Sequence, residues 1–150
     1  MYNLGVIHTK IKDFNKSIEF YQEALKINPV HDLSMLNIGK IYNETEDYVK
    51  AISCFKKALE INSDFSSAWF NMGFSLSKIG NTEKAIECYK KSIELNDKDI
   101  LVYLDVIELL IIDLNFEEAE NYLKIAKTII TDPNFILSFL AIINSVMLNN

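Results

Sequence analysis

The stretch Ala68–Asp97, AWFNMGFSLSKIGNTEKAIECYKKSIELND, is the unit around which the chain is organised. Its features recur upstream and downstream at an interval of 34 residues, at which glycine aligns with glycine, small residues align with small residues, and rings mostly align with rings: Gly5, Gly39 and Gly73; Ser17, Ala51, Ala85 and Ala119; Ala24, Ala58, Ser92 and Ala126; Tyr21, Phe55, Tyr89 and Leu123. A period of roughly 20–50 residues is typical of a solenoid in which each unit buries its apolar face against its neighbours. The sequence therefore predicts a tandem array.

The composition limits the class of protein. Of the 150 residues, 49% are apolar, which excludes wholesale disorder. The net charge is −6 and all 15 basic residues are lysines. Phosphate binding draws on clustered Lys and Arg, so this balance disfavours nucleic acid as the main partner.

The register predicts one domain, 1–150, with four repeats of two helices each. The repeats are 1–31, which lacks the start of its first helix, 32–65, 66–99 and 100–133, and a terminal helix follows at 134–148. The expected helices of the three better-formed repeats are Phe14 to about Ile27, then 33–44, 48–61, 66–78 and 82–95. An oxygen-bearing side chain precedes each second helix and predicts an N-cap: Asp13, Asp47, Asn81 and Asn115. Gly80 is expected to supply a tight turn.

The C-terminal end departs from the pattern. Ile107 stands where the other repeats have glycine, so the helices of the fourth repeat are expected to lie further apart or to be rotated. The last helix, NFILSFLAIINSVML, has no charged residue. It is too short to span a membrane comfortably, since about 20 residues are needed. It is therefore either an internal helix exposed by truncation, a docking site for another domain, or a surface for self-association through Phe135, Phe139, Ile142, Ile143 and Val146.

The first helices carry a motif that resembles the signature of the tetratricopeptide repeat family. The matching stretches are Met1–Gly5 (MYNLG), Met35–Gly39 (MLNIG) and Trp69–Gly73 (WFNMG), and the small-residue columns agree with them. The resemblance implies an all-α fold, an α-α superhelix that is right-handed and built of antiparallel helix pairs. It also implies a non-enzymatic scaffold whose first helices line a concave groove for a peptide or protein segment.

The groove is expected to be partly apolar and partly amide-lined. Asn3, Asn37 and Asn71 form a column that ends in Asp105, and an amide can pair with both the N–H and the C=O of an extended peptide. This column is similar to the asparagine ladder in the repeats of the protein O-linked N-acetylglucosamine transferases. In an alternative interpretation, the asparagines only bond between helices and the apolar residues pack between first helices. The predicted groove residues are Asn3, Leu36, Asn37, Lys40, Phe70, Asn71, Phe74, Leu104 and Asp105.

Chaperone-adaptor members of the family grip a ligand's terminal carboxylates with two asparagines and several cationic residues. Of the matching positions here, only Asn37 fits that clamp; they are Tyr2, Val6, Asn37, Ser67 and Asn71. Without cations such a site cannot compensate the desolvation of a carboxylate. The sequence therefore predicts no binding of acidic chaperone tails.

No motif in the sequence carries catalysis, and no cofactor or metal is expected. His8 and His31 are expected to be surface or packing residues, and Cys54 and Cys88 reduced packing residues. No signal peptide is evident at Met1, so the expected compartment is the cytoplasm, with neither nucleic acid nor membrane as partner. Three hypotheses remain: a peptide-binding scaffold, a module that forms a homodimer through its C-terminal end, and the recruiting domain of a larger enzyme.

Overall fold

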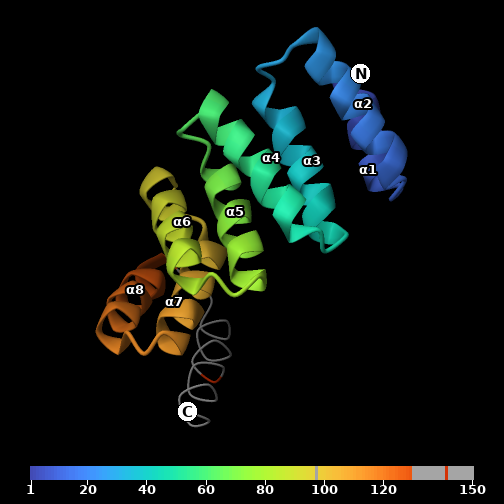
Figure 1. The fold of residues 1–150 in the computed structure, drawn as a ribbon. Coiled ribbons are helices and arrows are strands. Elements are labelled where there is room, and N and C mark those ends of the chain that lie inside the picture. The colour runs from blue at the N-terminus through green and yellow to red at the C-terminus, as the bar shows by residue number, and fades with distance from the viewer. Residues whose placement is uncertain (97, 130–140, 142–150) are drawn as a thin grey trace.

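The computed structural model describes residues 1–96, 98–129 and 141, and it consists of paired helices arranged along one direction (Figure 1). Apart from the single residue at 141, all described helical residues belong to eight helices, and no described residue lies in a strand. The helices are α1 (Tyr2–Lys10), α2 (Phe14–Ile27), α3 (Asp32–Glu44), α4 (Tyr48–Ile61), α5 (Ser66–Lys78), α6 (Thr82–Leu95), α7 (Ile100–Ile112) and α8 (Phe116–Ile129). The predicted terminal helix 134–148 lies outside the described residues, apart from residue 141.

The pairs follow one another in chain order, with α1 and α2 at one end and α7 and α8 at the other (Figure 1). Each second helix packs on its own first helix, and α2, α4 and α6 also pack on the first helix of the next pair. The core is accordingly a series of buried clusters, each shared by neighbouring pairs. This architecture confirms the predicted all-α helical-repeat solenoid.

The bounds of α2 to α6 agree with the predicted ones except that α3 begins at Asp32, one residue earlier than expected. The reason is His31, whose Nδ1 accepts the N–H of Ser34 at 3.1 Å and so caps the helix. Because histidine is an uncommon cap, the capping pattern does not predict this role for His31.

Three of the four predicted caps make the expected hydrogen bond. The side chains of Asp13, Asp47 and Asn115 accept the backbone N–H three residues further on, at 3.4, 3.3 and 3.4 Å. Asn81 occupies the N-cap of α6, but its side chain makes no cap hydrogen bond, so the prediction is wrong there.

Three of the first helices need glycine at the equivalent positions Gly5, Gly39 and Gly73, because an aromatic ring from the second helix lies against each of them. A Cβ atom on Gly39 would lie 2.5 Å from Cε1 of Phe55, and Gly5 and Gly73 meet Tyr21 and Tyr89 in the same way. Real Cβ atoms do not approach so closely, so no larger residue fits without movement of the ring.

In the fourth pair both partners of this contact change together. Ile107 is only 1% exposed, and Leu123 packs against the same buried cluster. Ile107 and Leu123, two branched aliphatic residues, thus replace the glycine and the aromatic ring of the other pairs. A larger separation of α7 and α8 stays a prediction.

The turns within the pairs share one backbone conformation. Gly80 has φ +79°, as the predicted tight turn requires, and the equivalent Lys12, Glu46 and Leu114 have φ near 60°. Glycine adopts this left-handed conformation without steric cost, whereas the other three residues do not.

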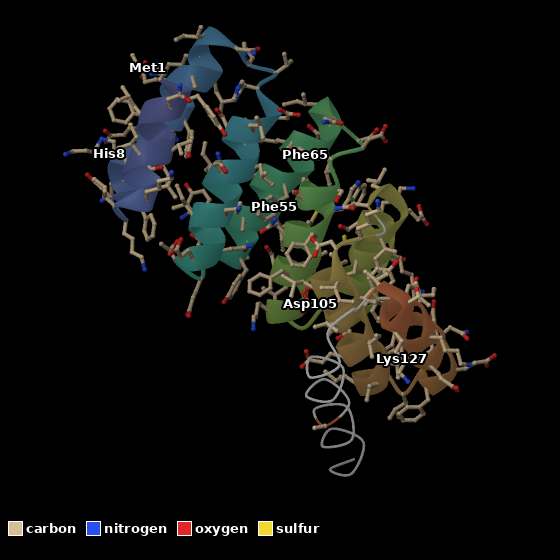
Figure 2. The ribbon with its side chains drawn as sticks, turned by 180° about the vertical axis from the view of Figure 1, so that it is seen from behind. Met1, His8, Phe55, Phe65, Asp105 and Lys127 are labelled. Atoms are coloured by element: carbon tan, nitrogen blue, oxygen red, sulfur yellow. The ribbon has the colours of Figure 1, made fainter. Side chains whose placement is uncertain are left out.

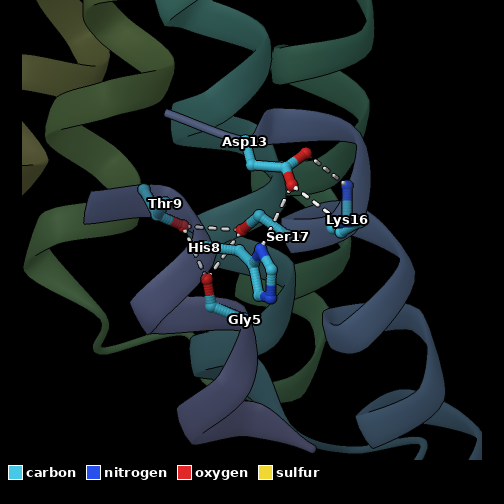
Figure 3. A network of polar contacts seen from close by, with 6 residues as sticks. All are labelled: Gly5, His8, Thr9, Asp13, Lys16 and Ser17. Atoms are coloured by element: carbon cyan, nitrogen blue, oxygen red, sulfur yellow. Dashed lines mark hydrogen bonds and ion pairs between the residues drawn. The ribbon is translucent and has the colours of Figure 1, made fainter. Parts of the chain in front are cut away.

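The first pair adds a polar network to the packing (Figure 3). Ser17 stands in the alanine column and is fully buried. Its hydroxyl donates to the Gly5 carbonyl oxygen at 2.8 Å and lies 2.6 Å from the Thr9 hydroxyl, which also donates to that carbonyl oxygen. These bonds satisfy a hydroxyl that would otherwise destabilise the core. Beside them, Nδ1 of His8 lies 3.3 Å from an Asp13 carboxylate oxygen, an ion pair when the imidazole is protonated (Figure 3).

Gly39→Ala is expected to lower the free energy of unfolding by about 1–3 kcal/mol, because overpacking against Phe55 outweighs the gain in helix propensity. Combining it with Phe55→Leu, the size exchange seen in the fourth pair, should recover about 1 kcal/mol relative to additivity. Urea denaturation of the two single variants and the double variant measures this coupling.

Gly80→Ala is the matched control, because a Cβ there meets no atom within 4 Å and its cost comes only from the positive φ. It should show no coupling to Phe55→Leu. Additive free energies for Gly39→Ala and Phe55→Leu would contradict the contact described above.

Candidate peptide-binding groove

Three of the first helices, α1, α3 and α5, are joined directly by side-chain hydrogen bonds. Asn37 Nδ2 donates to the Tyr2 hydroxyl at 3.2 Å, which links α3 to α1. The Ser75 hydroxyl donates to Asn43 Oδ1 at 2.6 Å, which links α5 to α3. α1, α3 and α5 therefore lie side by side and offer a continuous candidate surface.

The asparagine column is present on this surface but is not a ladder of mutual hydrogen bonds. Asn3 is exposed, and Asn37 and Asn71 are half-buried. Asn71 Nδ2 donates to the Ser67 carbonyl oxygen of its own helix at 2.7 Å. Among the described residues, the side-chain oxygens of Asn37 and Asn71 accept no hydrogen bond, so each amide keeps an acceptor for another group.

Two of the predicted apolar residues, Phe70 and Leu104, pack against the cluster around Tyr89, and each is half-buried. The ring centroids of Phe70 and Tyr89 are 5.8 Å apart. Leu36, by contrast, is 6% exposed and belongs to the same buried cluster as Met72. Leu36 thus packs between first helices, as the alternative interpretation allows, and its contact with a ligand stays a prediction.

Phe74 contacts a ring from the preceding helix pair and a lysine of its own helix. The ring of Tyr48, from the preceding second helix, meets it edge-on at 6.4 Å, and Lys78 Nζ lies 5.2 Å from its centroid. Lys40 is exposed, and the described part of the chain places no carboxylate within ion-pair distance of it. Both lysines are therefore open to solvent or to a ligand.

Asp105, the last member of the asparagine column, is a half-buried carboxyl group. Figure 2 labels its position. Its burial, and then the charges of Glu108 and Asp99, raise the pKa of Asp105 to about 6. Lys78 and a hydrogen bond with the Tyr89 hydroxyl oppose this rise. The groove therefore carries a carboxyl group that changes charge close to neutral pH.

The structure brings Phe70, Phe74 and Asp105 together through shared neighbours, Tyr89 and Lys78. It leaves Asn3 and Lys40 separate from them, on α1 and α3. Sequence reasoning missed Tyr48. It is the first residue of α4, and two other second helices, α2 and α8, also begin with an aromatic residue, Phe14 and Phe116. That column could have indicated a side chain that reaches the next pair.

The paired helices, the stacked first helices and the glycine–ring contacts define a helical-repeat interaction fold. Two models of the tetratricopeptide repeat match residues 1–64 and 66–99, and together they span well over half of the chain. The chain therefore belongs to the tetratricopeptide repeat family, which is generally a non-catalytic protein-interaction module. No helix in the described ranges is long and apolar enough to cross a bilayer.

Several solved structures share the fold. MamA has 21% sequence identity and a TM-score of 0.78, over 84% of this chain and 74% of that one. YrrB, described as a TPR protein with an unusual peptide-binding site, has 20% identity and a TM-score of 0.77, over 85% and 66%. The first TPR of Spaghetti (RPAP3), bound to the HSP90 peptide SRMEEVD, has 17% identity and a TM-score of 0.70, over 72% and 86%. No curated protein sequence matches the chain.

The raised pKa of Asp105 predicts a pH-dependent stability. Between its ordinary pKa of 3.8 and about 6 the folded state binds the proton and the unfolded state does not, so stability falls as pH rises through this window. Asp105→Asn should remove this loss and raise the free energy of unfolding by about 1–2 kcal/mol near pH 7, with little effect below pH 4. Urea denaturation across this range measures the difference.

Glu120→Gln is the matched control, since that carboxylate is exposed and, among the described residues, pairs only with Lys124 at the surface. Its effect should stay within about 0.5 kcal/mol at every pH. A stability profile of Asp105→Asn parallel to that of the parent chain would contradict the assignment.

Proposed function

We propose that this chain is a non-enzymatic scaffold that binds a peptide or protein segment on its first helices, without a dicarboxylate clamp. The observation that carries the proposal is the turn Phe70–Asn71–Phe74 of α5. There two half-buried rings lie within one helical turn of an amide whose oxygen accepts no hydrogen bond among the described residues. Half-buried rings beside an open polar group are typical anchor points of binding surfaces.

The arrangement suits an extended segment with apolar side chains. Asn37 and Asn71 pair with the ligand's backbone and fix its register, while Phe70, Phe74 and Leu104 contact its side chains. Lys78 and Asp105 lie beside the rings and favour a polar group at that end. That YrrB has a peptide-binding site and that the RPAP3 domain holds a peptide support the same use here. The proposed compartment is the cytoplasm.

The test of the groove begins with a peptide selected by display against the full chain. Asn71→Ala should weaken its binding about tenfold, the value of one hydrogen bond of about 1.4 kcal/mol. Asn15→Ala, an exposed asparagine on α2, is the matched control and should leave affinity unchanged. Circular dichroism checks the helix content of both variants. Equal affinity for both, together with no effect of Phe70→Ala, would contradict the proposed groove.

The chain has no lysine at the positions where chaperone-adaptor members of the family bind a ligand's terminal carboxylates, and this gives a second prediction. The peptide SRMEEVD, which the RPAP3 domain binds, should bind this chain more weakly than about 1 mM, because none of the clamp positions carries a cation that offsets the desolvation of its carboxylates. Isothermal calorimetry measures this, with the selected peptide as positive control. Micromolar affinity for SRMEEVD would refute the prediction.

Self-assembly is the alternative function. Among the described residues, the fourth pair exposes an apolar group that favours an interface: Ile112, Leu114, Phe116 and Ile125. The predicted contact residues Phe135, Phe139, Ile142, Ile143 and Val146 lie outside the described residues. Light scattering decides between the two, since a homodimer has twice the mass of a monomer. A role as the recruiting domain of a larger enzyme stays a third hypothesis.

A further inference from the structure

A hollow of about 360 Å³ lies between α4, α5 and α6. Its apolar lining comes from all three helices and from the turn after α5: Ile52, Trp69, Met72, Leu76, Ile79 and Cys88. A smaller hollow of about 270 Å³ shares Ile52 and Ile79 with it and extends along α4. The two hollows therefore adjoin each other, and we name the larger one the α4–α6 hollow.

The α4–α6 hollow lies on the opposite side of α5 from the proposed groove. Trp69, Met72 and Leu76 are spaced three and four residues apart and so share one face of the helix. Phe70, Asn71 and Phe74 lie on the other face, because each residue turns the helix by about 100°. A ligand in the hollow would leave the groove residues free.

The mouth of the hollow carries an excess of positive charge. Lys56 and Lys84 line it and are exposed, and within the described ranges neither pairs with a carboxylate. Glu87 is the one acidic residue of the lining. Lys56 and Glu87 both act on the pKa of the Cys88 thiol, which burial raises to about 11, so both charges lie close to the apolar floor. In a chain of net charge −6, two unpaired ammonium groups over an apolar floor favour an amphiphilic anion.

We propose that the α4–α6 hollow binds a small carboxylic acid with an apolar body, such as a medium-chain alkyl acid. At about 30 Å³ per heavy atom, the hollow holds about a dozen atoms, and its volume lies at the lower end of the range for small-molecule sites. The alkyl chain lies against Met72, Leu76 and Ile79. Its carboxylate lies between Lys56 and Lys84. This site is independent of the proposed peptide groove.

Trp69 is the only tryptophan of the chain and lines the hollow, so its fluorescence reports occupancy. Titration of the full chain with octanoate should give a saturable change with a dissociation constant of about 0.1–1 mM. Lys56→Gln/Lys84→Gln should weaken octanoate binding at least tenfold, and Glu87→Gln should strengthen it about threefold. Octanol, which lacks the charge, should be insensitive to all three changes.

Two further variants test where octanoate binds. Ile79 is 48% exposed, so Ile79→Asp keeps the fold and should abolish octanoate binding by placing a negative charge at the mouth. Asn71→Ala, on the groove face, should leave it unchanged. No saturable signal, or equal octanoate affinity in the parent and the double lysine variant, would overturn the proposal. A Trp69 signal that follows protein concentration without octanoate would assign the hollow to a second copy of the chain, and would also overturn it.

Discussion

The contact between a glycine of the first helix and a ring of the second determines how the rest of the structure is built. In three pairs the ring occupies the volume that a Cβ atom would need, so the two backbones approach closely. The second helix is then placed to pack on the next first helix. Repetition of this contact aligns the first helices side by side. The candidate binding surface is thus a consequence of a size constraint that lies in the core, away from the surface itself.

In each helix pair, the residue of the first helix opposite the ring position matches the side chain found there. Where the ring is tyrosine, the first helix supplies a hydroxyl to it: Thr9 lies 3.2 Å from the Tyr21 hydroxyl, and Ser77 hydrogen-bonds that of Tyr89. Asn43 is the equivalent residue opposite Phe55, whose ring has no hydroxyl. Asn43 Oδ1 instead accepts a hydrogen bond from the Ser75 hydroxyl of the next pair. Ile111, opposite Leu123, needs no polar partner. A buried hydroxyl without a partner is costly, so the two columns change together.

The period of 34 residues was enough to predict a tandem array, because small residues and rings recur wherever helices must approach. The resemblance to the tetratricopeptide repeat supplied the all-α fold, and the cap and turn residues supplied most helix bounds. The candidate site was less predictable. Leu36 occupies a position on α3 from which its side chain could reach either the candidate groove or the neighbouring first helix. Only the packing seen in the structure shows that it joins the buried cluster around Met72. The partner of Asn37 is Tyr2, a ring from the preceding repeat, which no local pattern indicates. The charge state of Asp105 depends on burial, which the sequence does not contain.

Tyr89 shows how the core and the candidate groove depend on each other. Its ring lies against Gly73 on one side and contacts Phe70, while its hydroxyl hydrogen-bonds Asp105 and Ser77. A displacement of this ring would therefore move an apolar anchor and a carboxyl group of the groove at once. Since Tyr89 is almost fully buried, such displacement is opposed by the packing of the whole third pair. The candidate surface at α5 and α7 is accordingly held in place by the same contact that holds the helix pair together, and a segment bound to the proposed groove would meet side chains that are already ordered.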